Sequence, residues 1–148
     1  MATDSALLRC RSCSTLNRVP VRRLSHNPIC GRCKTLLDFP FLPVSVTGAS
    51  LDQEISTWLE TVLIEFWTKD CALCRTVDPS VSDIAFSRAG KLKVLKVDVE
   101  AEAGLADLYS VQATPTFITF RNGRQLARLD GAPRESSELM KWVDESMQ

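Results

Sequence analysis

The cysteines of this 148-residue chain fall into three Cys-x-x-Cys pairs, and no cysteine lies outside them. The pairs are Cys10/Cys13, Cys30/Cys33 and Cys71/Cys74. A pair with this spacing either supplies half of a metal site or cycles between dithiol and disulfide. Persistent structural disulfides are rare in a reducing cytosol, so these two uses are the ones to separate.

The distances between the pairs separate them. Cys13 and Cys30 enclose 16 residues, whereas Cys33 and Cys71 enclose 37. The first interval falls inside the window of about 15–20 residues that is typical of structural zinc sites. The first two pairs therefore predict one Zn²⁺ site with four cysteine ligands. Its role is either structural or redox-sensitive, with oxidants that modify the thiolates releasing the ion. His26 is a possible competing ligand, but four thiolates complete the site without it, and we interpret it as a loop residue.

Residues 10–33 contain little besides cysteine from which a core can form, so we expect this segment to need the metal in order to fold. Gly31 lies between the second pair of cysteines and suits a tight turn, because glycine adopts positive φ without steric cost. Short ribbon strands are predicted around Val19, Val21, Leu24, Leu36 and Leu37.

The distribution of charged residues also divides the chain shortly after the second cysteine pair. Residues 1–38 carry seven Arg or Lys and two Asp, a net +5, while residues 39–148 carry eleven bases and sixteen acids, a net −5. We predict a zinc-ribbon-like module over 1–38, a connector with two prolines over 39–43 and an α/β domain over 44–148. A zinc ion with four thiolates adds about −2 and so offsets part of the basic excess of the module.

From residue 44 onward, apolar runs alternate with amphipathic segments. Strands are predicted over 44–47, 61–67, 93–98, 116–120 and 125–129, and helices over 51–59, 71–88, 101–109 and 136–147. Ser50 is the expected N-cap of the first helix, and Asn122-Gly123 predicts a hairpin turn. This order of elements indicates a mixed central sheet with helices on both faces.

The third cysteine pair follows a buried strand and begins a helix. A thiolate at a helix N-terminus is stabilised by the dipole and by unpaired amides, so Cys71 is the expected nucleophile. Cys74 lies one turn further along and is the expected resolving thiol.

Several blocks of sequence around this pair resemble the thioredoxin family in the same order along the chain. They are residues 64–75, Pro79, 91–98, 113–117, 120–123 and 131–132. With the upstream cysteines included, the chain resembles the thioredoxin 2 family, the bacterial thioredoxins that carry an N-terminal zinc module. The resemblance implies a thioredoxin fold and protein-disulfide oxidoreductase activity.

The resemblance also implies roles for further residues. Glu65 matches a buried acid that assists proton transfer at the resolving cysteine, and Lys96 matches the lysine beside that acid. An alternative stays open for each residue: Glu65 points to solvent at the sheet edge, or the alternation of the strand directs Lys96 outward. Pro115 matches a cis-proline that exposes the backbone of Thr114 to an extended substrate. The substrate-binding surface implied by the resemblance comprises Trp67, Asp70, Ala72, Leu73, Thr114, Pro115 and Gly131.

The active-site string departs from the Trp-Cys-Gly-Pro-Cys of the family, because Asp70, Ala72 and Leu73 replace three of its residues. The charge of Asp70 beside the nucleophile opposes the helix dipole and is worth about 1 kcal/mol. We therefore expect the pKa of Cys71 to be higher than in an ordinary thioredoxin, and its disulfide to be harder to reduce.

Two other classes of function compete with the oxidoreductase. One is a non-catalytic adaptor or a zinc-dependent, redox-regulated chaperone. The other is nucleic-acid binding by the basic module, which its arginines alone do not predict, because no aromatic residues are interleaved with them. The expected partners are disulfide-containing proteins, with an NADPH-dependent thioredoxin reductase as candidate electron donor. No organic cofactor, membrane span or signal peptide is predicted, and a bacterial cytoplasmic location is expected.

Overall fold

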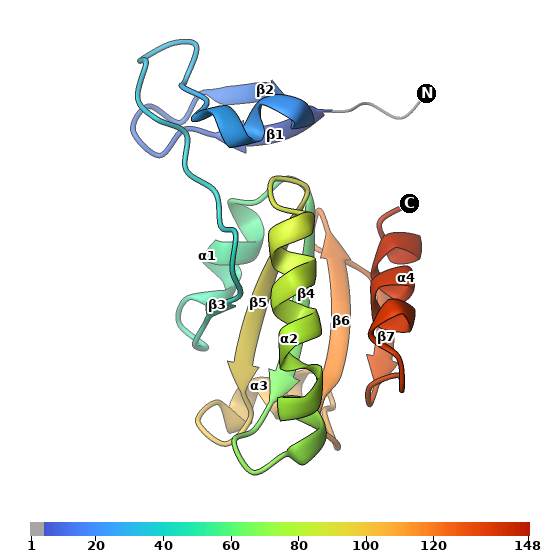
Figure 1. Cartoon of the computed structure of the whole chain (residues 1–148). Coiled ribbons are helices and arrows are strands. Elements are labelled where there is room, and N and C mark those ends of the chain that lie inside the picture. The colour runs from blue at the N-terminus through green and yellow to red at the C-terminus, as the bar shows by residue number, and fades with distance from the viewer. Residues whose placement is uncertain (1–4) are drawn as a thin grey trace.

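The structure is a computed structural model that describes residues 5–148. Two sheets are stacked along its long axis, a small one formed by the N-terminal residues and a larger one formed by the rest (Figure 1). The small sheet pairs β1 (Ser5–Arg9) with β2 (Leu16–Pro20) in antiparallel fashion, and a 3-10 helix, Val21–His26, follows it. The prediction of short ribbon strands was correct for Val19, which lies in β2, and for Leu36, which forms an isolated bridge with Ile29. It was wrong for Val21 and Leu24, which lie in the 3-10 helix, and for Leu37, which lies in no strand, and β1 was missed.

The large sheet has five strands in the order β3-β5-β4-β6-β7. Its strands are β3 (Val44–Ser45), β4 (Thr61–Trp67), β5 (Leu92–Asp98), β6 (Thr116–Arg121) and β7 (Arg124–Asp130). β3, β5 and β4 are parallel to one another, β6 runs antiparallel to β4, and β7 runs antiparallel to β6. This mixed sheet confirms the predicted fold class.

Within residues 5–148, four α-helices cover the sheet. They are α1 (Leu51–Ser56), α2 (Ala72–Ser87), α3 (Ala103–Leu108) and α4 (Ser136–Ser146). Side chains from α2 and α4 share one core with Leu63 of β4, whereas Val62, Ile64 and Phe66 face the opposite core with α1 and α3. Because successive strand residues point to opposite faces, Glu65 lies on the side of Leu63, under α2.

The helix α1 begins at Leu51 with Ser50 as its N-cap residue, as predicted. Ser50 makes no side-chain capping bond to the helix, and its Oγ instead accepts a hydrogen bond from the backbone amide of Thr47 at 2.9 Å. The helix ends at Ser56, three residues before the predicted end. The amide of Thr57 bonds the carbonyl of Gln53, and the indole of Trp58 turns back to bond the carbonyl of Thr61 at 3.0 Å.

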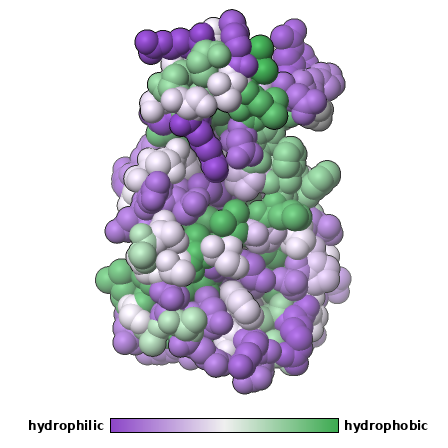
Figure 2. Space-filling view, turned by 90° about the vertical axis from the view of Figure 1, so that its left-hand side faces the viewer, coloured by the Kyte–Doolittle hydropathy of each residue, from purple (hydrophilic) through white to green (hydrophobic). Residues whose placement is uncertain are grey.

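The N-terminal module packs directly on the α/β domain. Its buried side chains Ala6, Leu8 and Leu24 belong to the same apolar cluster as Leu51 of α1 and Val62 of β4. Figure 2 shows mainly hydrophilic side chains over the module at the top of the view, with a hydrophobic patch at mid-height below it. The connector contributes to this junction, because Phe39 is buried and its ring lies 4.8 Å from that of Phe41.

Candidate active site and metal centre

Cys71 and Cys74 form a disulfide at the N-terminus of α2, with their Cα atoms 5.2 Å apart. Cys71 is the N-cap residue, and its Sγ accepts a hydrogen bond from the amide of Cys74 at 3.0 Å. Cys71 is half-buried, whereas Cys74 is only 5% exposed. The sulfur that a second molecule can reach is therefore that of Cys71.

Glu65 is a buried carboxylate next to this disulfide. Its side chain is 1% exposed, and neither carboxylate oxygen has a hydrogen-bond partner among the described residues. It lines a cavity of about 410 Å³ together with Cys74. Burial raises the pKa of Glu65 to about 7, the charge of Lys96 opposes this rise, and Asp78 adds to it. A group with this pKa exchanges a proton readily near neutral pH.

Lys96 points inward, toward Glu65. Its Nζ lies 3.8 Å from Oε1 of Glu65, 2.8 Å from Oδ1 of Asp78 and 4.9 Å from the ring centre of Trp67. Glu65 and Lys96 are also direct neighbours across the parallel pairing of β4 and β5. Asp78, which the sequence analysis did not single out, thus belongs to this group. Asp78 follows Cys74 by four residues on α2, and residues four apart lie on the same face of a helix, so this spacing could have predicted its place near the cavity.

A cis peptide bond between Thr114 and Pro115 lies beside the disulfide, as the resemblance implies. The carbonyl oxygen of Thr114 lies 3.4 Å from Sγ of Cys71. Gly131, with φ of 88°, donates its amide to the carbonyl of Pro115 at 2.7 Å, which joins the loop after β7 to this segment. The substituted residues Asp70, Ala72 and Leu73 are all exposed around Cys71.

The other four cysteines converge in the N-terminal module. The Sγ atoms of Cys10, Cys13, Cys30 and Cys33 lie within 4.8 Å of one another. Two of the separations are 3.5 Å, between Cys10 and Cys33, and 3.6 Å, between Cys13 and Cys30. Four thiolates at about 2.3 Å from a tetrahedral Zn²⁺ lie about 3.8 Å apart, so this group fits zinc. His26 is exposed and is not among these ligands.

The two halves of this cluster have the same backbone geometry. Cys10 donates its amide to the carbonyl of Thr15, and Cys30 donates its amide to that of Thr35. The left-handed residue of each turn follows the second cysteine, since Ser14 and Lys34 both have φ of 65°. The expectation of positive φ at Gly31 was wrong. The amide of Gly31 instead donates to Oδ1 of Asn17, which ties the second turn to β2.

The backbone of these turns also favours the thiolate form of a ligand. The amide of Cys33 lowers the pKa of Cys30 to about 6, although burial acts in the opposite direction. A lowered pKa helps metal binding, because cysteine must lose its proton before it can bind a metal.

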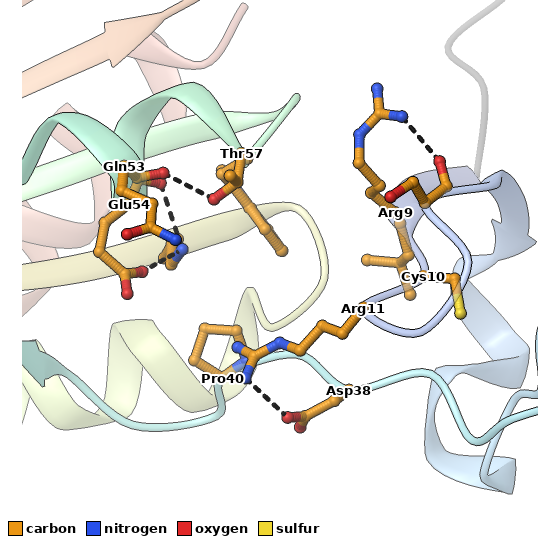
Figure 3. A pocket seen from close by; sticks show the side chains of 12 residues that line it. Arg9, Cys10, Arg11, Asp38, Pro40, Gln53, Glu54 and Thr57 are labelled. Atoms are coloured by element: carbon orange, nitrogen blue, oxygen red, sulfur yellow. Dashed lines mark hydrogen bonds and ion pairs between the residues drawn. The ribbon is translucent and has the colours of Figure 1, made fainter. Parts of the chain in front are cut away.

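The two centres lie at opposite ends of the α/β domain (Figure 1). The 16 residues of α2 separate them, which corresponds to about 24 Å along the helix axis. Between the module and the domain lies a second cavity of about 500 Å³, shown in Figure 3. Arg11 extends from the module across this cavity and forms an ion pair with Asp38 at 3.5 Å.

Glu60 joins the module to the domain at the start of β4. Its carboxylate, 4% exposed, accepts hydrogen bonds from the backbone amide of Leu7 at 3.1 Å, from Nζ of Lys91 at 3.2 Å and from Arg121 at 3.3 Å. Lys91 also donates to the carbonyl of Ser5 at 2.8 Å. Side-chain patterns do not predict this contact, because its donor from the module is a backbone amide.

A model of the thioredoxin family, described as "Thioredoxin", matches residues 43–145. The chain belongs to the thioredoxin family. A second model, described as "Thioredoxin 2, N-terminal", matches residues 9–35, which include the four clustered cysteines. The chain is thus a thioredoxin with an N-terminal zinc ribbon, and Cys71 and Cys74 are its pair for dithiol–disulfide exchange.

Known thioredoxins are similar to this chain in sequence and in structure. Thioredoxin C-3 of Corynebacterium nephridii is 30% identical over 142 residues, which cover 96% of either chain. A thioredoxin of Mycobacterium tuberculosis is 33% identical over 101 residues, or 68% of this chain and 87% of its own length. Among solved structures, a mutant thioredoxin from Halobacterium salinarum matches with a TM-score of 0.67 and 27% identity over 75% of this chain and 96% of its own.

The thioredoxin from Fasciola hepatica matches with a TM-score of 0.64 and 27% identity, over 70% of this chain and 98% of its own. Across residues 5–148, none of the helices is both long and apolar enough to cross a membrane.

Proposed function

We propose that this thioredoxin reduces disulfide bonds in proteins, with Cys71 as nucleophile and Cys74 as resolving thiol. The observation that supports the proposal most strongly is the asymmetry of the pair: a half-buried sulfur at the helix N-terminus, beside a buried sulfur that shares a cavity with Glu65. Exchange at such a pair needs one accessible thiolate and one protected partner.

In the first step, the thiolate of Cys71 attacks one sulfur of the substrate disulfide. A mixed disulfide forms, and the other substrate sulfur leaves as a thiolate that takes a proton from water. In the second step, the thiolate of Cys74 attacks Sγ of Cys71 and releases the second substrate thiol. The two electrons that reduce the substrate come from the two thiolates, which end as the Cys71–Cys74 disulfide.

Glu65 is the proposed base for Cys74. A buried thiol ionises reluctantly, and a carboxylate whose pKa is about 7 accepts a proton near neutral pH. Lys96 and Asp78 line the same cavity and form an ion pair, so their charges offset each other. Trp67 lines the same cavity, with its ring 4.9 Å from Nζ of Lys96.

The substrate-binding surface in this proposal is the exposed rim around Cys71. The backbone of Thr114 beside Pro115 is available to pair with an extended substrate segment, with Gly131 supporting the loop. Asp70, Ala72 and Leu73 border the same opening. An NADPH-dependent thioredoxin reductase is the proposed electron donor, and the bacterial cytoplasm is the proposed location.

For the module, we propose one zinc ion held by Cys10, Cys13, Cys30 and Cys33, with a structural role and no organic cofactor. Bound zinc stabilises a fold that has little apolar core of its own. The proposed division of the chain is the module over 1–38, the connector over 39–43 and the redox domain over 44–148.

Reduction of insulin tests the proposed activity. The dithiol form of the full chain is expected to cleave the insulin interchain disulfides in the presence of a small dithiol, and Cys71→Ser is expected to abolish the acceleration. Cys74→Ser should accumulate a mixed disulfide that is visible by mass spectrometry. If the protein is instead an adaptor that only binds peptides, insulin reduction will not be accelerated, and the wild-type chain and Cys71→Ser will behave alike.

A further inference from the structure

Two openings of opposite net charge lie beside the redox disulfide. One is the cavity beside Glu65, whose lining has three bases, Lys69, Arg75 and Lys96, and two acids, Glu65 and Asp78. The other, which we call the acidic groove, is an open groove of about 400 Å³ between the residues after β4 and the helix α3. Its walls include Thr68, Glu100, Asp107, Gln112 and Thr114.

The acidic groove carries negative charge without compensation. Glu100 and Asp107 are its charged members, and none of the described residues that line it is Lys, Arg or His. Glu100 is held in place, because its carboxylate accepts a hydrogen bond from Oγ1 of Thr68 and its amide donates to Oδ1 of Asp98 at 2.9 Å. Asp107 is exposed on α3. The remaining walls are mostly small and apolar, with Ala103 and Ala106 among them.

The acidic groove adjoins the reacting sulfur through Thr114. Thr114 forms part of its wall, and the carbonyl of the same residue lies 3.4 Å from Sγ of Cys71. A polypeptide segment joined to Cys71 by a mixed disulfide, and paired with the backbone of Thr114, therefore passes along the groove on one side of its cysteine. Asp70, exposed next to Cys71, adds a further negative charge near the junction.

We propose that the acidic groove selects protein substrates with a lysine or arginine on one flank of the attacked cysteine, and that Glu100 and Asp107 determine this specificity. The inference rests on the proposed disulfide reductase function. Charge complementarity at an exposed site mainly accelerates productive encounter and discriminates against like-charged partners. Because Lys69 and Arg75 border the other opening, the preference is for a base on one flank and not on both.

Short peptides with a single cysteine test the proposal. The cysteine is joined by a disulfide to 5-thio-2-nitrobenzoate, whose low thiol pKa makes it the leaving group and directs attack to the peptide sulfur. The peptides carry Lys, Gln or Glu two residues before the cysteine, or two residues after it. The zinc-loaded, reduced full chain is mixed with each peptide, and the release of thionitrobenzoate gives second-order rate constants.

On one flank, the Lys peptide is expected to react about fivefold faster than the Glu peptide at low ionic strength. The ratio should fall below about twofold in the double variant Glu100→Gln, Asp107→Asn, and also in 1 M salt. The ratio within one variant is the readout, so a general change in reactivity cancels. A matched control, Asp83→Asn with Glu138→Gln, removes two exposed acids from α2 and α4 and should keep the fivefold ratio.

Equal rates for Lys and Glu peptides on both flanks would overturn the specificity while leaving the reductase function intact. A ratio that survives in the double variant, or that the control variant abolishes equally, would also overturn the role of Glu100 and Asp107. If the wild-type chain reduces none of the peptides, including the neutral ones, then the proposed reductase function itself fails.

Discussion

The module and the redox domain use the same four-residue cysteine spacing for different chemistry, and the chain after the second cysteine makes the difference. In the module, a left-handed residue, Ser14 or Lys34, follows the pair and turns the chain back, so four sulfurs converge. In the redox domain, the chain continues from Cys74 into the 16-residue helix α2. Two sulfurs then remain alone at a helix N-terminus, where a thiolate is stabilised for attack.

The largest expected effect breaks the module without breaking the redox domain. Cys30→Ser removes a buried ligand and should eliminate stoichiometric zinc binding, because a structural site contributes about 10–16 kcal/mol to the fold that surrounds it. Metal analysis and hydrogen exchange measure this, with loss of amide protection expected in β1 and β2. Cys71→Ser is the matched control and should keep both zinc and protection. Full zinc occupancy in Cys30→Ser would contradict the four-cysteine site.

The next effect concerns the buried carboxylate of the redox domain. Burial raises the pKa of Glu65 from 4.5 to about 7, so the folded state binds a proton more tightly than the unfolded state does. The protein therefore loses stability relative to Glu65→Gln as pH rises from about 4.5 through 7. The variant should be more stable by about 3 kcal/mol at pH 8 and by little at pH 4.

Urea unfolding of the oxidised proteins at the two pH values measures this difference. Glu138→Gln, an exposed acid on α4, is the control and should show no such pH dependence. A stability difference of the same size at both pH values would rule out proton binding at Glu65 as the cause.

A smaller effect tests whether the two regions are independent. Glu60→Ala removes the acceptor of three hydrogen bonds, of which the one from Leu7 links the module to the domain, and should cost about 1–3 kcal/mol. We expect faster proteolysis and faster hydrogen exchange in the module, with zinc still bound. Glu102→Ala, an acid that binds Gly48 within the domain, serves as comparison. Unchanged exchange in β1 would show that the apolar contacts hold the module without Glu60.

The smallest effect lies at the entrance to the redox site. Asp70→Asn removes a negative charge beside Cys71 and should lower the pKa of its thiol by up to about one unit. Thiolate absorbance at 240 nm, followed against pH in the reduced protein, measures the change. Asp83→Asn, further along α2, is the control. No fall in the pKa would reject the electrostatic effect of Asp70.

Residue patterns within single segments predicted a central strand, a buried acid and the cysteine cluster. The continuous apolar run over 61–67 predicted β4 with its observed bounds. Because Glu65 lies inside this apolar run, its burial was predicted as well. Cysteine spacing gave the four-sulfur cluster. The resemblance to a known family, and not the pattern, supplied the expectation for Pro115.

Contacts between distant segments were not predictable in the same way. β1 is held by pairing with β2 and by the amide of Leu7 bonding Glu60, 53 residues away. A backbone donor leaves no trace in side-chain periodicity. The positive φ of Ser14 and Lys34 was missed because neither residue type favours that conformation.

The separation of the two cysteine centres along α2 bears on how the chain matures. Six free cysteines allow fifteen complete sets of disulfide pairs, of which most would trap the chain in a wrong topology. If the first four are sequestered at one end as metal ligands during synthesis, a single pairing remains for the other two. Metal binding then determines which two cysteines are left to form the disulfide.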